Sequence, residues 1–177
     1  MKHGEMQAAF DPRDALLERS GAGLCALAFL ITEDWDLTID AVAGSLDAGL
    51  KADALCTARR LVAAEAVAAI RPRLRESAVR IAAMTVDPVE WLGPAPETST
   101  VRPPTRGDVE RALLSIDGFP RVVLLLTIFE GFSIADAGRL LDTSDRLVRQ
   151  GLMIGLLALT RHVSCQTRKR SPWVCRN

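Results

Sequence analysis

The sequence lacks tyrosine altogether and has only 5% aromatic residues, which is little for a protein built from β-sheets. Strands are enriched in aromatic and β-branched residues, whereas this chain is rich in alanine, leucine and arginine, which favour helices. Hydrophobic residues still occupy 49% of its 177 positions, enough for well-packed cores. We therefore expect an all-α protein.

Long apolar runs are missing as well. No stretch approaches the length that a bilayer-spanning helix needs, and residues 1–10 lack the apolar core of a signal peptide. We therefore expect a cytoplasmic protein without a membrane partner. The cysteines have no CxxC spacing and are interpreted as buried or idle reduced thiols, with a zinc site or a disulfide frame as the alternative: Cys25, Cys56, Cys165 and Cys175.

Groups suited to catalysis are scarce. His3 and His162 are the only histidines, and neither has a companion cysteine or serine at catalytic spacing. Phosphate-loop, dinucleotide and HExxH motifs are all absent. Asp34, Asp36 and Asp40 bunch at the start of one predicted helix, where the helix dipole explains acidic residues more simply than a metal or an acid pair does. The sequence predicts no enzyme activity, no cofactor and no metal.

A proline-rich segment divides the chain. Residues 85–105 hold five prolines with Gly93 and a serine/threonine cluster, a composition typical of a semi-extended linker. It separates a helical domain over 10–84 from a second one over 106–163, and a basic tail follows at 164–177. In the first domain we expect a helix that opens at 11–12, an apolar segment over 24–31, and helices over 35–50 and 52–70. A proline at position 72 ends or kinks the last of these, and 73–84 is expected to continue as another helix.

The second domain carries clear start and stop signals for four helices. Thr105 with Asp108 resembles a capping box, and Ser133 with Asp136 starts a later helix by the same logic. Asp142 falls at a tight turn where a left-handed backbone is often needed. The last helix is capped by Ser144, and small Ala137 and Gly155 are expected to let the last two helices cross closely. These features predict a four-helix domain that ends in a helix-turn-helix, a unit that usually presents its second helix to DNA.

Charge is distributed unevenly although the net charge is zero. Residues 106–160 hold six arginines against seven acidic residues, so this domain lacks a strongly basic face. Residues 161–177 carry five basic and no acidic residues. That tail either supplies phosphate contacts or is a flexible, solvated end.

The layout resembles a small bacterial RNA polymerase sigma factor of the extracytoplasmic-function type, over roughly residues 24–163. The matching positions of the first domain are 27–29, Asp34, 40–42 and 59–60. Those of the second domain are Arg121, 123–126, 130–131, Ser133, Ala137, 140–141, Val148, Leu152 and Leu159.

The resemblance implies two partners, core RNA polymerase and promoter DNA. An antagonist of the anti-sigma type or self-association is a further option. Polymerase-binding positions would be Asp34, Asp40 and Val42. The recognition helix would read DNA in the major groove, with Arg121 supporting the backbone; Arg121 and Arg146 could equally be surface arginines in ion pairs. The positions assigned to DNA binding are Arg121, Ser144, Asp145, Arg146, Arg149 and Gln150.

The predicted recognition helix is unusually apolar where the family is basic. Four of its residues cannot all enter the small core, so they would form a protein interface, unless the first domain folds over them or the helix register differs. These residues are Met153, Ile154, Leu156 and Leu157.

Two functions follow. The first is a sigma-factor-like protein that binds core RNA polymerase and directs promoter-specific initiation. The alternative is a degenerate sigma-like scaffold that acts by protein–protein interaction, with little DNA binding.

Overall fold

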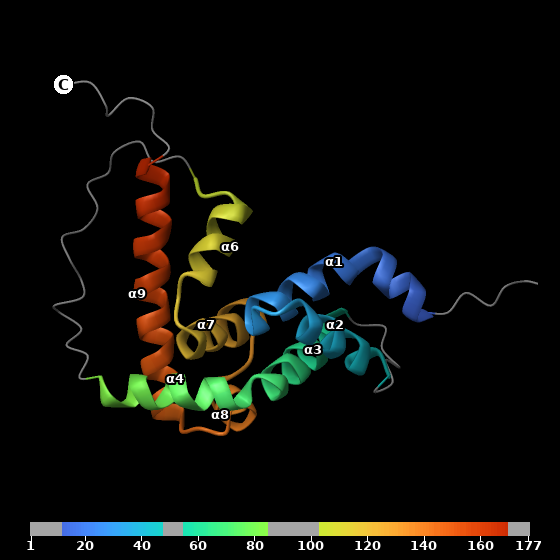
Figure 1. The fold of residues 1–177 in the computed structure, drawn as a ribbon, viewed down its shortest axis with the longest axis horizontal. Helices are drawn as coiled ribbons and strands as arrows, with labels where there is room; N and C mark the ends of the chain where they lie inside the picture. The colour runs from blue at the N-terminus through green and yellow to red at the C-terminus, as the bar shows by residue number, and fades with distance from the viewer. Residues whose placement is uncertain (1–11, 48–54, 85–102, 170–177) are drawn as a thin grey trace, which may run out of the picture.

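The described residues form helices only, which confirms the predicted all-α class. The computed structural model describes residues 12–47, 55–84 and 103–169, and no strand occurs within these ranges. Most of the predicted linker, at 85–102, and the end of the predicted tail, at 170–177, lie outside them, as does Cys175. The elements in Figure 1 are α1 (Pro12–Thr32), α2 (Trp35–Asp47), α3 (Leu55–Ala69), α4 (Arg71–Ala83), α6 (Arg106–Leu114), α7 (Gly118–Leu124), the π-helical turn η1 (Leu125–Phe129), α8 (Ile134–Leu141) and α9 (Asp145–Lys169).

Helices α1, α2 and α3 pack against one another in the first half of the chain (Figure 1). The inward side of α3 consists largely of alanine and valine, which lets α1 and α2 approach it closely. Buried residues recur every three or four positions on both helices, as an amphipathic helix requires. They are Leu24, Leu27, Ala28 and Ile31 on α1 and Ala58, Val62, Ala63, Ala66 and Val67 on α3.

A tight corner joins α1 to α2. Glu33 takes a left-handed backbone with φ 56°, which reverses the chain direction. Asp34 Oδ1 then accepts hydrogen bonds from the backbone N–H groups of Asp36, at 2.9 Å, and Leu37, at 3.2 Å. These bonds satisfy donors that the first turn of α2 would otherwise leave unpaired. The corner therefore fixes the direction in which the Glu33 side chain leaves the bundle.

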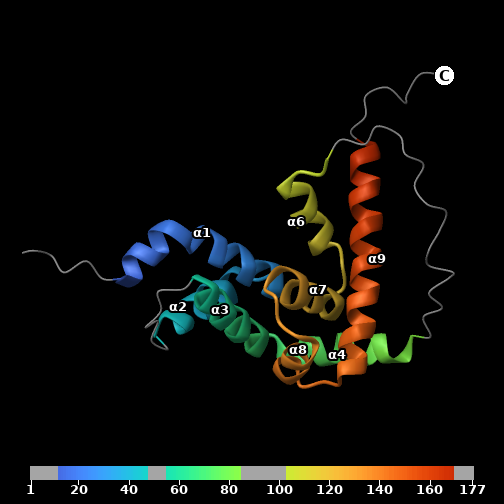
Figure 2. The same ribbon diagram turned by 180° about the vertical axis from the view of Figure 1, so that it is seen from behind.

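Helix α4 leaves this bundle and packs mainly on the second half of the chain. The proline at position 72 lies in its first turn, where a missing N–H costs little. Its buried side chains, Leu74, Ser77 and Ile81, face α7 and α9 rather than α1–α3. Figures 1 and 2 show α4 crossing the N-terminal end of α9. Helix α4 ends next to the predicted domain end at 84, and it packs on helices from beyond that boundary.

The second half is centred on α7 and η1. Thr105 and Asp108 form the predicted capping box at the start of α6. Asp117 caps α7, and almost every side chain from Phe119 to Leu126 is buried. Gly131, with φ 68°, allows the chain to turn after η1 and enter α8. This apolar pair of short helices is the core against which α9 packs.

Two glycines bring α9 into close contact with α7. A Cβ atom on Gly155 would lie 2.7 Å from Leu124 Cδ1 and 2.9 Å from the Pro120 carbonyl oxygen. On Gly151 it would lie 2.8 Å from Phe119 Cε1. The expectation that Gly155 allows the last two helices to cross is therefore corrected: its close neighbour is α7, not α8.

The two halves share one hydrophobic core in the described residues. Helix α9 extends to Lys169, so the predicted end of the second domain at 163 and the predicted start of the tail both fall inside a helix. Within the described ranges, no helix combines the length and apolarity needed to cross a membrane.

Candidate nucleic-acid interface

The candidate site lies at the start of α9, and local hydrogen bonds build it. Asp142 takes the predicted left-handed conformation, with φ 53°, and ends α8. Thr143 then donates its N–H to the Gly138 carbonyl at 2.9 Å, which closes the turn. Ser144 Oγ accepts from the backbone N–H of Leu147 at 3.3 Å, so the predicted cap of α9 is present. These contacts fix how the first turns of α9 emerge from the protein.

Two arginines on these turns point into solvent. Arg146 and Arg149 are both exposed, and among the described residues neither takes part in an ion pair. Ser144 and Asp145 beside them are exposed as well. Free guanidinium groups on a protruding helix can bind phosphate, or guanine O6 and N7 in a bidentate manner. Four of the six predicted DNA-binding residues thus share one open surface.

Gln150, the next predicted DNA-reading residue, is already engaged. Its Nε2 donates hydrogen bonds to the backbone carbonyls of Ile81, at 2.9 Å, and Met84, at 3.0 Å, at the C-terminal end of α4. These carbonyls lack helical partners because the helix ends there. The amide therefore holds α9 against α4 and is not available to a base edge in this arrangement.

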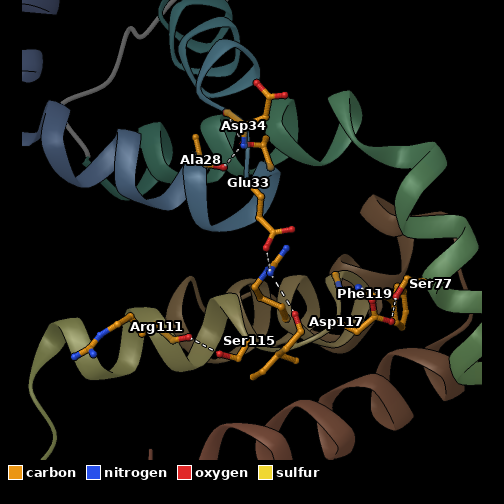
Figure 3. Close-up of polar contacts among 12 residues, drawn as sticks. Ala28, Glu33, Asp34, Ser77, Arg111, Ser115, Asp117 and Phe119 are labelled. Carbon is orange, nitrogen blue, oxygen red and sulfur yellow. Dashed lines mark hydrogen bonds and ion pairs between the residues drawn. The ribbon is translucent and has the colours of Figure 1, made fainter. Parts of the chain in front are cut away.

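Arg121 is buried, in contrast to its predicted place on the DNA backbone. Only 3% of its side chain is exposed. Its Nη1 donates to Glu33 Oε1 at 2.7 Å and to the Ile116 carbonyl at 3.2 Å, while its Nε has no partner among the described atoms. Figure 3 shows Glu33 reaching from the α1–α2 corner toward α7. The DNA role is corrected because this guanidinium cannot reach a phosphate without separation of the two halves.

Charged groups join the halves at two further places. Glu130 is nearly buried and accepts two hydrogen bonds from Arg59 of α3, one of them from Nε at 2.8 Å. Arg60 on the next position donates to the Gly131 carbonyl and lies over the Phe132 ring, 4.9 Å from its centroid. Arg59 and Arg60, at positions that matched in the resemblance, therefore both bind the second half of the chain.

Asp117 joins α4 to the start of α7. Its carboxylate accepts hydrogen bonds from Ser77 Oγ at 2.7 Å and Arg80 Nη2 at 3.0 Å, and it caps α7 through Gly118 N–H. Ser77 Oγ also accepts from Phe119 N–H at 3.0 Å, an arrangement visible in Figure 3. Partial burial raises the pKa of Asp117, but the hydrogen bonds from Ser77, Arg80 and Gly118 outweigh it, and the pKa lies below its ordinary value of 3.8.

A second basic surface next to α9 was missed at the level of sequence. Arg75 of α4 bonds to Asp142 in the α8–α9 turn at 2.7 Å, with both side chains largely exposed. Arg73 on the same helix is also exposed. The excess of basic residues over 51–82 was the available signal, but nothing local indicated that α4 would lie beside the turn.

The predicted polymerase-binding positions lie on or near α2. Asp40 is exposed, whereas Val42 is only 7% exposed and belongs to the core. Val42 is therefore corrected to a packing residue. Asp34 mainly caps α2 through its own carboxylate.

The outer face of α2 carries two large apolar side chains that sequence reasoning missed. Trp35 and Ile39 are both 59% exposed. Trp35 stacks on Phe29 of α1 with ring centroids 4.9 Å apart. Their spacing of four residues places them on one side of the helix, where exposed Asp36 and Asp40 lie beside them. The spacing of four residues between Trp35 and Ile39 was the available signal, but the core residue Val42 follows Trp35 by seven residues, so apolar periodicity alone did not separate the exposed side chains from the buried ones.

The predicted apolar interface on α9 is mostly covered. Ile154 is 8% exposed and belongs to the core, Met153 and Leu157 are half-buried, and Leu156 is 40% exposed. Helices α6 and α7 provide most of this cover. The expectation of an open patch is corrected for Ile154, because the two glycines let this side of α9 approach α7.

Other chemistry is sparse in the described part of the chain. No group of three histidine, cysteine, aspartate or glutamate side chains suited to a metal ion occurs there. Comparison with known proteins finds no matching family model, no similar curated sequence and no similar solved structure.

Proposed function

We propose that this protein is a sigma-factor-like DNA-binding protein that binds core RNA polymerase and directs promoter-specific transcription initiation. The observation that carries the proposal is that Arg146 and Arg149 are both exposed on the first turns of α9 and form no ion pair with the residues that the structure describes. Helix α8, the left-handed turn at Asp142 and α9 have the order and capping of a helix-turn-helix, whose second helix enters the major groove with its N-terminal residues. Arginine at these positions suits both phosphate contact and guanine recognition.

The face of α2 supports the polymerase part of the proposal. Trp35 and Ile39 provide an exposed apolar centre, and Asp36 and Asp40 border it. Aromatic residues surrounded by polar groups are typical of protein interfaces. Such a face suits a helical partner with apolar and basic residues.

A scaffold without promoter reading is the second candidate. It is favoured by Gln150 being held by α4 and by Arg121 being buried under Glu33. In that case the α2 face is the main functional surface.

Salt-titrated DNA binding tests the first function directly. Binding of Arg149→Ala to promoter-library duplexes is compared with that of the wild type. Arg106→Ala is the matched control, because Arg106 is exposed on α6 and pairs with Glu110. Arg149→Ala should lose about 1–3 kcal/mol of binding free energy to preferred duplexes, and the control should bind as the wild type does. Equal binding by all three proteins contradicts promoter reading by α9.

Co-purification with core RNA polymerase tests the α2 face. Ile39→Arg should remove the complex, whereas Val79→Arg, at an exposed apolar position of α4, should retain it. A wild-type protein that binds core RNA polymerase but not the duplexes would favour the scaffold without promoter reading. A complex that survives Ile39→Arg excludes this face as the contact.

A further inference from the structure

Helix α4 covers one side of the first turns of α9. Its last two carbonyls hold the Gln150 amide, and its Arg75 bonds to Asp142 in the turn before α9. The ribbon views show the same crossing from opposite sides (Figures 1 and 2). The contacts therefore extend from the turn at the start of α9 to its second turn.

This placement conflicts with entry into a DNA groove. The major groove is about 12 Å wide, and a helix with its side chains is about 10–12 Å across. The groove therefore has no spare width for α4 on the side of α9 where Gln150 lies, although Arg146 and Arg149 remain exposed. Gln150 would also have to release the two carbonyls before it could reach a base.

The attachment of α4 is narrow. Only Leu74, Ser77 and Ile81 of its 13 residues are buried. Hydrogen bonds also hold α4 in place. Its Arg80 and Ser77 donate to Asp117 and its Arg75 donates to Asp142, while the Gln150 amide donates to a carbonyl at the C-terminal end of α4. The arginine pairs are exposed, and exposed pairs contribute little. Because α4 buries only these three side chains, its detachment would disrupt less of the core than separation of α7 from α9 would.

We propose that α4 is a displaceable cover that holds the protein in a state unable to bind duplex DNA. Detachment of α4 from α7 and α9 is then required for duplex DNA to bind α9. The proposal rests on the proposed function of α9 and adds a regulatory step to it. When the binding-competent state is a minor population, the apparent affinity is lowered by the fraction that is open. Weakening the cover should therefore tighten DNA binding.

Charge-neutral substitutions in α4 provide the test. Leu74→Ala combined with Ile81→Ala removes both apolar anchors and leaves every arginine in place. Val79→Ala is the matched control, because Val79 is on the same helix but 69% exposed. Binding is measured by anisotropy with short, labelled random-sequence duplexes, and helix content by circular dichroism.

The double variant should bind duplex DNA about tenfold more tightly than the wild type, and Val79→Ala should match the wild type. Equal or weaker binding by the double variant overturns the cover while leaving DNA binding by the wild type intact. Of these two outcomes, weaker binding would further indicate that docked α4 contributes its arginines to the DNA contact. If neither the wild type nor the double variant binds DNA, both the cover and the proposed function fail.

Hydrogen exchange on the wild-type chain keeps the test independent of variant folding. Addition of the same duplexes should accelerate amide exchange in peptides covering 71–84. Unchanged or slower exchange there, with DNA bound, overturns the proposal.

Discussion

Glu33, at the left-handed corner between α1 and α2, binds the guanidinium of Arg121, which is buried in α7, with 2.7 Å between Oε1 and Nη1. The pair is asymmetric: half of the Glu33 side chain is exposed, whereas Arg121 is almost fully buried and its Nε has no partner in the described part of the chain. Burying a charge is costly unless it is paired, and a pair that leaves one donor unsatisfied compensates that cost only in part. The contact therefore serves to join the halves more than to stabilise them.

Removing Glu33 and removing Arg121 should change the stability of the protein in opposite directions. Glu33→Ala leaves a buried cation without a counterion and should lower the free energy of unfolding by up to about 3 kcal/mol. Arg121→Met fills the same space with apolar atoms and should be neutral or stabilising. Urea unfolding of the two variants and of their combination measures this, and the combination should resemble Arg121→Met. Equal destabilisation by both single variants would mean that the pair itself stabilises the fold.

The glycines that bring α9 close to α7 give a second prediction. Alanine at Gly155 gains about 1 kcal/mol of helix propensity, but its Cβ would lie within 3 Å of Leu124 and of the Pro120 carbonyl. Overpacking of this kind costs about 1–3 kcal/mol, so Gly155→Ala should be destabilising. Gly44→Ala is the control, because a Cβ there meets nothing within 4 Å, and it should be neutral or stabilising. Thermal unfolding distinguishes the two variants. A stabilised Gly155→Ala would show that the side chains of α7 can move away from the added Cβ.

The turn before α9 depends on a left-handed residue. Asp142 has φ 53° and also pairs with Arg75. Both Asp142→Asn and Asp142→Ala remove this pair, but asparagine tolerates the left-handed region and alanine does not. Alanine should therefore be less stable than asparagine by about 1 kcal/mol in urea unfolding. Equal stability of the two variants would contradict a conformational role for this position.

Stability should fall in acid because of Asp117. Its pKa in the folded protein lies below the ordinary value, so its carboxylate favours folding above the unfolded pKa, and the contribution is lost as the pH falls through the folded pKa. Asp117→Asn still caps α7 but carries no charge for Arg80. The unfolding free energy of this variant should decline less steeply than that of the wild type below about pH 4. Superimposable acid limbs would exclude this group as a source of the pH dependence.

The candidate site was predictable where its geometry is local. Ser144, Asp142 and Ser133 act within a few residues of the chain, so the turn and the exposed starts of α8 and α9 could be derived from the sequence. The partners of Arg121 and Gln150 could not be predicted in this way. Both depend on partners more than 60 residues away, Glu33 and the end of α4. No local rule links those positions.

The sequence by itself determined that this protein is helical and where several of its helices begin, such as α6 at Thr105 and α8 at Ser133. Caps, prolines and apolar periods act through hydrogen bonds and steric limits between near neighbours, so they are largely independent of the rest of the fold. Only the tertiary structure decided that α4 lies on α9, that Arg121 is buried and that two glycines bring α9 onto α7. An apolar stripe such as Leu74 and Ile81 can pack on any complementary surface, and the choice depends on the packing of the whole chain.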